Sequence, residues 1–406
     1  MRRWSASAFL LTLAAACATA AVETIPIPDL PPQARLALCG DSITEQMLYT
    51  RYVEYVLLAS AGRSDVQVFQ FGWAGENADQ FAVRVRRGDL DALDPTVVTM
   101  LYGANDVGGM DWQPWMETMW RGRCSQLVAA VAQRYPATAG RIVICGPTVF
   151  ETPDGGEARG DAALERLRGI NRELAGQNKA GFADVRRRMQ ETRAAAGTGC
   201  RIAGRDGVHP GPEGHLAIAS EILRALGWNG EVGSIDIDMA GEVRASAGHQ
   251  VLSSAPGRAR LASSRWPFCW ERGTPDAVPL QGIRTALPYD RELNRLILRV
   301  SGLRSAQADV TWSGRVLRFS AVELREGVNL ARAFADTPFD SLAAEAMRRI
   351  AERQLLERDA IKRAGSPLAE AKAWTAEDLQ RRAVIASAIA RALVPVEHEL
   401  SVVPVP

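Results

Sequence analysis

The sequence predicts a three-layer α/β/α fold built on a mainly parallel, five-stranded sheet. Between residues 35 and 228, short runs of β-forming residues alternate with longer amphipathic runs, which is the pattern of βαβ units. The short runs are almost entirely apolar, as expected for strands that helices cover on both faces. The five candidate strands are 35–39, 66–71, 96–102, 141–145 and 181–185. Functional side chains are then expected in loops beyond the carboxyl ends of these strands.

Composition and length predict a globular protein with one large core and a second module. The chain has 406 residues, 47% of them hydrophobic, and its 48 basic and 47 acidic residues give a net charge of +1. This balance gives no electrostatic reason to expect a nucleic-acid partner. We expect four parts: a signal peptide over 1–20, the α/β domain over 21–228, a β-rich accessory region over 229–326 and a helical region over 327–406.

The first twenty residues have the pattern of an export signal. Arg2 and Arg3 precede an apolar stretch over 6–16, and the small residues 18–20 suit a signal peptidase. We therefore expect a periplasmic or secreted protein, with a lipoprotein anchored through Cys17 as the alternative. The stretch is too short for a membrane span, and no later segment reaches the roughly 20 apolar residues that a spanning helix needs.

Five cysteines remain after the expected signal peptide: Cys39, Cys124, Cys145, Cys200 and Cys269. Export permits disulfides, but an odd number leaves at least one thiol unpaired within the chain. The sequence leaves the pairing open, including a bridge through Cys200. No CxxC motif or Cys/His cluster indicates a metal site.

Ser42 lies where the first candidate strand gives way to a helical pattern. Such a turn exposes a serine at the carboxyl edge of the sheet, close to backbone N–H groups that favour negative charge. Two interpretations of the residue stand at this point. Ser42 is a nucleophile, or Ser42 and Glu45 form an ordinary helix capping box.

Three further blocks follow candidate strands in order. Gly75 lies in a glycine-containing loop after the second strand, Asn105 follows the third, and Asp206 and His209 form an Asp-x-x-His block after the fifth. Each block alone has a simpler interpretation as a turn, a cap or a surface imidazole. Together with Ser42, in this order and at one edge of a sheet, they indicate a catalytic site.

These four blocks resemble those of the SGNH hydrolases, the GDSL-type esterases and lipases, over residues 35 to about 228. A segment at 327–331 resembles one found in longer bacterial members with a C-terminal extension. The resemblance implies a flavodoxin-like fold and carboxylic ester hydrolysis without a metal or organic cofactor. It assigns the oxyanion hole to the backbone N–H groups of Ser42 and Gly75 and the amide of Asn105. One departure is Gln70, where the family often has asparagine.

Acyl transfer by a serine needs a base and a group that orients the base. His209 can take the Ser42 proton, and Asp206 can orient the imidazole and stabilise its charged form. The other three histidines lack an equivalent Asp-x-x-His context.

Candidate substrate contacts are Trp73 in the glycine loop, Trp112 after Asn105, and Asp41 beside the serine. Indoles can stack on sugar rings or simply pack on the sheet. We expect short-chain O-acyl esters, O-acetyl esters first, on a polysaccharide or cell-wall glycan. The alternatives are a lysophospholipase or thioesterase with a deep apolar tunnel, and a non-catalytic carbohydrate-binding protein on the same fold.

Beyond residue 228 the pattern changes. Runs at 234–239, 296–300 and 316–319 are β-like, with turn signals between them. From 339 to about 393 the pattern is helical and rich in Arg and Glu. We expect these helices to cover the α/β domain with their charged residues facing solvent, and the alternative is a helix pair that binds a partner.

Overall fold

The computed structural model describes residues 23–197, 200–270, 280–368 and 374–406. Its central sheet has five parallel strands in the order β2-β1-β3-β4-β5. The strands are β1 (Arg35–Gly40), β2 (Gln67–Gly72), β3 (Val97–Leu101), β4 (Ile142–Cys145) and β5 (Gly181–Ala183). The predicted α/β fold is confirmed, and each strand lies within a residue or two of its predicted range.

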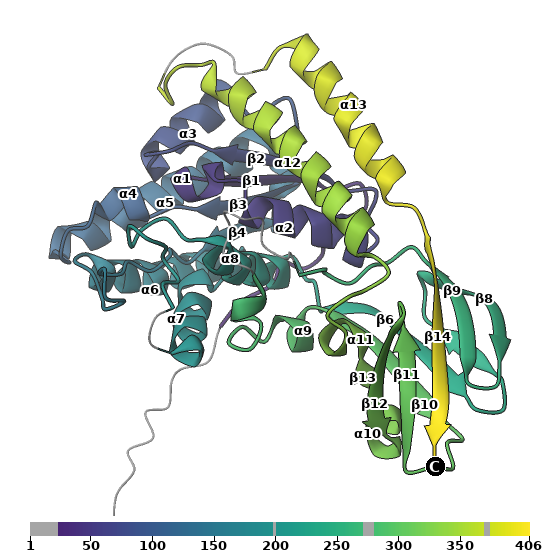
Figure 1. Cartoon of the computed structure of the whole chain (residues 1–406). Coiled ribbons are helices and arrows are strands. Elements are labelled where there is room, and N and C mark those ends of the chain that lie inside the picture. The colour runs from purple at the N-terminus through teal and green to yellow at the C-terminus, as the bar shows by residue number, and fades with distance from the viewer. Residues whose placement is uncertain (1–22, 198–199, 271–279, 369–373) are drawn as a thin grey trace, which may run out of the picture.

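Helices cover both faces of this sheet (Figure 1). One face carries α2 (Tyr49–Tyr55) with its π-helical continuation 56–60, α7 (Val185–Ala196) and α8 (Pro212–Ala225). The other carries α3 (Ala78–Arg87), α5 (Pro114–Arg134) and α6 (Asp161–Gln177). Strand β1 shows why the fold forms: Leu36 and Leu38 enter one core, and Ala37 and Cys39 enter the other. Short helices α1 (Ser42–Glu45) and α4 (Ala104–Val107) follow β1 and β3.

The remaining strands form two further sheets (Figure 1). One has the order β13-β10-β6-β7, and the other has the order β12-β11-β14-β9-β8. Their strands are β6 (Glu231–Asp238), β7 (Val243–Ala245), β8 (His249–Ala255), β9 (Arg258–Ser263), β10 (Arg295–Ser301), β11 (Gln307–Trp312), β12 (Arg315–Ser320), β13 (Val328–Asn329) and β14 (Val396–Val405). Short helices between them are α9 (Tyr289–Glu292), α10 (Ala321–Glu326) and α11 (Leu330–Ala333), and 3-10 turns span 136–138 and 280–283.

The C-terminal region is not helical to its end. Helices α12 (Asp340–Lys362) and α13 (Ala376–Ala392) lie side by side over β2 and α2, and the chain then returns as β14 (Figure 1). The helical region expected over 327–406 is therefore wrong for residues 396–405. These residues alternate between buried Val396, His398, Leu400 and Val402 and outward neighbours, which is the period of a strand. β14 pairs with both β9 and β11, so it completes the five-stranded accessory sheet.

The charged residues of α12 and α13 do not all face solvent, contrary to the expectation from the sequence. Arg353, Glu357 and Arg382 are buried against β2, the edge strand of the central sheet. Arg382 donates to the Val68 carbonyl at 2.7 Å and to Glu357 at 2.7 Å, and Gln70 N–H donates to Glu357 at 3.1 Å. An edge strand presents unpaired backbone groups, and these side chains satisfy them while pairing their own charges.

The expected export signal and Cys17 lie outside the described residues. Cys39, Cys124, Cys145, Cys200 and Cys269 are all free thiols in the structure, so none of these five forms a disulfide. Over the described part of the chain, no helix combines the length and apolar character needed to cross a membrane.

Candidate active site

Ser42, His209 and Asp206 form one hydrogen-bonded chain. Ser42 Oγ lies 2.8 Å from His209 Nε2, and His209 Nδ1 lies 2.7 Å from Asp206 Oδ2. The other Asp206 oxygen accepts the backbone N–H groups of Val208 at 3.0 Å and His209 at 2.8 Å. Burial raises the pKa of Asp206, but these hydrogen bonds outweigh it and lower the pKa to about 2. The carboxylate therefore stays ionised and favours the Nδ1–H tautomer of the imidazole.

The loop that carries Asp206 and His209 is held by Glu151, a residue that sequence reasoning missed. Glu151 is buried, and its carboxylate accepts the Ala203 N–H at 3.0 Å and pairs with Arg193 at 3.2 Å. Its backbone N–H donates to the Gly207 carbonyl at 2.9 Å. Gly207 has φ +77°, and a Cβ there would lie 1.9 Å from the Glu151 carbonyl oxygen. Only glycine fits this close approach.

The helix that begins at Ser42 is capped by Asp41 and not by a box between Ser42 and Glu45. Asp41 Oδ1 accepts the Ile43 N–H at 3.0 Å. Burial raises the pKa of Asp41 to about 7, although the Ile43 hydrogen bond and nearby His209 oppose the shift. Glu45 instead points to the next loop, where it accepts the Ala74 N–H at 2.5 Å. The capping-box interpretation is therefore wrong, because the Glu45 carboxylate is engaged elsewhere.

Asn105 contacts the loop that carries Gly75. Asn105 Nδ2 donates to the carbonyl of Glu76, the residue after Gly75, at 3.0 Å, and lies 3.3 Å from Asp41 Oδ2. Gly75 has φ +78° in a turn closed by the Glu76 N–H and the Trp73 carbonyl. Within the described residues, the backbone N–H groups of Ser42 and Gly75 have no hydrogen-bond acceptor. They are available to a ligand beside the Ser42 hydroxyl and the Asn105 amide.

A cavity of about 350 Å³ opens over the serine. It is lined by Asp41, Ser42, Ile43, Ala104, Asn105, Gly108, Gly109, Phe150, Glu151, Ala158, Arg159, Asp206, Gly207, Val208 and His209. These residues follow β1, β3 and β4 or precede α8, so the cavity lies at the carboxyl edge of the sheet, as predicted. Asp41 contributes to this lining, and its role as a substrate contact stays a prediction.

Trp73 does not line this cavity. Its side chain is buried, with Lys362 Nζ 4.6 Å from the ring centroid and the Arg84 guanidinium 5.3 Å from it. These distances are typical of cation–π contacts. The prediction that Trp73 stacks on substrate is therefore wrong: the indole packs between a core arginine and the end of α12.

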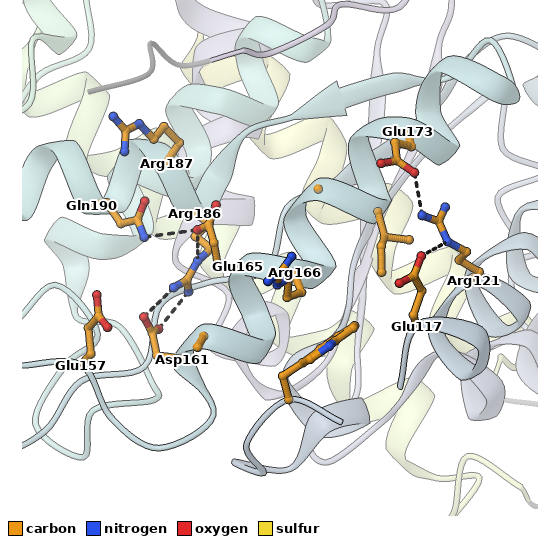
Figure 2. Close-up of a pocket in the computed structure, with 14 residues that line it drawn as sticks. Glu117, Arg121, Glu157, Asp161, Glu165, Arg166, Glu173, Arg186, Arg187 and Gln190 are labelled. Carbon is orange, nitrogen blue, oxygen red and sulfur yellow. Dashed lines mark hydrogen bonds and ion pairs between the residues drawn. The ribbon is translucent and has the colours of Figure 1, made fainter. Parts of the chain in front are cut away.

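Trp112 lines a different cleft, of about 780 Å³, which also takes in residues from α5, α6 and α7 (Figure 2). Figure 2 shows two of its arginines paired: Arg186 contacts Asp161 and Glu165, and Arg121 contacts Glu117 and Glu173. Residues 157 and 161 line this cleft, whereas 158 and 159 line the serine cavity. One short segment thus separates Trp112 from the triad, and Trp112 is not brought into the cavity itself.

Gln70 makes the local bond that its position requires. Its Oε1 accepts the Gly72 N–H at 3.0 Å, and its Nε2 lies 3.4 Å from the Gln354 carbonyl on α12. The substitution for asparagine therefore links the glycine loop to the C-terminal region.

Among the residues that the structure describes, no group of three or more His, Cys, Asp or Glu side chains is placed to hold a metal ion. The chemistry available at the site is that of a serine hydroxyl, an imidazole, a carboxylate and several N–H donors. A serine in this arrangement, with N–H donors nearby, defines a site for acyl transfer.

Residues 38–217 match the model of the GDSL-like lipase/acylhydrolase family. The match contains Ser42, Gly75, Asn105, Asp206 and His209. Residues 38–217 therefore form a GDSL-like lipase/acylhydrolase domain of the SGNH type, which is the domain of a carboxylic ester hydrolase.

A solved structure shows the same fold over nearly the whole chain. A gut microbial diltiazem-metabolizing enzyme has a TM-score of 0.74 and 20% identity, with 94% of this chain and 100% of that chain covered. A catalytic mutant of an acetylxylan esterase from Geobacillus stearothermophilus has a TM-score of 0.41 and 20% identity, covering 48% of this chain and 94% of that chain. The first likeness includes the accessory sheets and the C-terminal helices. No curated protein matches the chain by sequence.

Proposed function

We propose that the protein is an exported serine esterase that hydrolyses short-chain O-acyl esters, O-acetyl esters first, on a polysaccharide or cell-wall glycan. The observation that carries the catalytic part is the continuous chain from Ser42 Oγ through His209 to the ionised Asp206. The export signal over 1–20 carries the location, since it has the charge and apolar pattern of a cleaved signal.

In the proposed reaction, Ser42 Oγ attacks the ester carbonyl while His209 Nε2 takes its proton. His209 then gives that proton to the leaving sugar oxygen, and Asp206 stabilises the imidazolium between the two steps. Water then attacks the carbonyl of the acyl-enzyme while His209 takes its proton, and the free acid leaves as Ser42 regains its proton. The N–H groups of Ser42 and Gly75 and the weakly held second N–H of Asn105 Nδ2 stabilise the oxyanion in both steps.

The size of the serine cavity favours a short acyl group. The cavity is about 350 Å³, and the charged side chain of Asp206 is exposed beside it. A long acyl chain gains ~0.8 kcal/mol for each methylene only where the wall is apolar. A larger apolar groove of about 640 Å³ lies between α2 and α12, but it shares no lining residue with the serine cavity. The lysophospholipase or thioesterase alternative needs an apolar tunnel that begins at Ser42.

The neighbouring cleft supports a polymeric substrate. A sugar that presents its ester to Ser42 can extend across the segment 157–161 toward the Trp112 cleft. Trp112 is half-buried there, among charged and polar side chains that can hydrogen-bond hydroxyl groups. Trp112→Ala should therefore lower kcat/KM on acetylated oligosaccharides several-fold and leave kcat/KM on an aryl acetate unchanged. Equal losses on both substrates contradict a sugar contact.

Ser42→Ala tests the catalytic assignment. Turnover of an aryl acetate should fall by at least about a thousandfold, while the circular dichroism spectrum stays that of the wild type. Ser254→Ala, which removes an exposed hydroxyl on β8, is the matched control and should keep full activity. A folded Ser42→Ala variant that keeps most of its activity rules out Ser42 as the nucleophile, whereas a wild-type protein that hydrolyses no activated ester revives a non-catalytic carbohydrate-binding role.

Acyl length tests the substrate. Acetyl esters should have a higher kcat/KM than butyryl esters, and octanoyl esters should be nearly inert. A kcat/KM that climbs with chain length refutes the glycan assignment and favours the lipid or thioester alternative, with Ser42 and His209 in the same roles.

A further inference from the structure

The last residue of α12 reaches the loop that carries Gly75. Lys362 Nζ lies 2.8 Å from Glu45 Oε2, and the same oxygen accepts the Ala74 N–H at 2.5 Å. Lys362 also covers the face of the Trp73 ring, at 4.6 Å from its centroid. Three segments far apart in the sequence therefore meet at one carboxylate: the serine helix, the glycine loop and the C-terminal helix.

Each of these contacts helps to fix the orientation of the Gly75 backbone N–H. Glu45 is the last residue of the helix that Ser42 begins, and its backbone packs directly on Gly72, where a Cβ would lie 2.2 Å from Glu45 N. The turn of residues 73–76 has glycine at its third position with φ +78°, as a type II turn requires. Type I and type II turns differ by a flip of the central peptide, which here carries the Gly75 N–H.

The Glu45 carboxylate holds this turn by accepting the Ala74 N–H, and Lys362 holds the carboxylate. The Lys362 side chain is 32% exposed and that of Glu45 20%, so the pair is partly shielded from water. Lys362 is itself positioned by α12, whose Gln354 accepts from Thr50 at 2.7 Å and whose Glu357 accepts from Gln70 N–H at 3.1 Å. The ammonium is therefore presented from a helix anchored on the hydrolase core.

We propose that Lys362 is a positioning residue for the esterase reaction, acting through Glu45 to fix the 73–76 turn with the Gly75 N–H aimed at the oxyanion. The C-terminal region thus completes the oxyanion hole without touching substrate. This inference rests on the proposed function, because it assumes that the Gly75 N–H stabilises an oxyanion.

The test compares three variants on an aryl acetate. Lys362→Met keeps an unbranched apolar stem over Trp73 but removes the charge, and kcat should fall about tenfold with KM within twofold of wild type. That fall is smaller than the 100-fold or greater loss typical of deleting a donor, since the donor is displaced and not removed. Lys362→Arg keeps the charge and should retain at least half of kcat. Arg358→Met, one turn earlier on α12 and paired within the described residues with its neighbour Asp359, is the control and should match wild type.

A double-mutant cycle with Glu45→Gln separates positioning from general destabilisation. If Lys362 acts through Glu45, the Lys362→Met/Glu45→Gln double variant loses no more kcat than the worse single variant. Losses that multiply, or a kcat for Lys362→Met within twofold of wild type, overturn the inference. If Ser42→Ala is inactive and Lys362→Met is fully active, the proposed function stands and only the role of Lys362 is refuted. Active, folded Ser42→Ala removes the proposed function itself.

Discussion

A buried hydrogen-bond chain in the accessory sheets makes the stability of the protein depend on pH. Trp312 Nε1 donates to His398 Nδ1 at 3.1 Å, and His398 Nε2 lies 2.8 Å from Ser263 Oγ. Ser263 Oγ lies 2.8 Å from His249 Nδ1, and His249 Nε2 lies 3.2 Å from the Val232 carbonyl. An indole can only donate and a carbonyl can only accept, so His398 must be neutral and donates through Nε2 to Ser263, while His249 donates through Nε2 to Val232. Ser263 Oγ can then donate to Nδ1 of a neutral His249.

Protonation of His398 breaks this chain, and burial opposes it as well. Burial and the neighbouring His249 lower the pKa of His398 to about 4, from about 6.5 for a free imidazole. The folded state therefore binds the proton more weakly than the unfolded chain does. Its stabilising contribution is fully present above pH ~6.5 and is lost as the pH falls through about 4. Between pH 7 and pH 5 the expected loss from this residue is about 2 kcal/mol.

His398→Gln isolates that loss, because the glutamine amide can accept from Trp312 and donate to Ser263 but does not titrate. Urea denaturation at pH 7 and pH 5 gives the free energy of unfolding of each protein. The wild type should lose about 2 kcal/mol more than His398→Gln over this range. Glu399→Gln, an exposed neighbour on β14, should behave as wild type. Equal losses in wild type and His398→Gln refute the neutral chain.

Three further predictions concern the site and the helix that covers it. Asn105→Ala should lower kcat on an aryl acetate by roughly 100-fold at an unchanged urea midpoint, and a loss below threefold excludes the amide as an oxyanion donor. Burial raises the pKa of Asp41 to about 7, so ionisation costs the wild type stability as the pH rises from about 4 to 7. The free energy of unfolding from urea denaturation should favour Asp41→Asn over wild type by about 3 kcal/mol more at pH 8 than at pH 5. Glu357→Ala leaves Arg382 buried without its carboxylate, while Arg353 keeps Glu54, and should cost about 3 kcal/mol or more of unfolding free energy, whereas exposed Glu352→Ala should cost little.

The sequence was sufficient to predict the central sheet and its carboxyl edge because these depend on local patterns. Each strand is an apolar run of the right length, and each polar block follows a strand directly. Ser42, Asn105 and His209 could therefore be placed at one edge without knowing any side-chain contact. The carboxyl ends of parallel strands lie at the same edge of the sheet regardless of the helices between them. Sites at this edge can therefore be predicted from the sequence.

Contacts between distant segments were not predictable in this way. Gln70 and Glu357 are 287 positions apart, and nothing near either residue marks the other as its partner. An Arg/Glu-rich helix is usually solvated, because a charge is costly to bury unless it is paired. Here Glu357 pairs with Arg382 and also meets the backbone of an edge strand, so the charges are buried. Trp73 was misassigned for the same reason, since Lys362 is 289 positions away and covers its ring.

The family match ends at residue 217, but the physical unit extends further. Without α12 and α13, the Val68 carbonyl and the Gln70 N–H lie on an open sheet edge, and the Phe69 ring loses the Arg382 guanidinium 3.3 Å from its centroid. An exposed, apolar edge strand is a template for association with other chains. We infer that residues 340–392 belong to the folding unit of the hydrolase, so that loss of these helices affects the fold first and the chemistry of Ser42 only as a consequence.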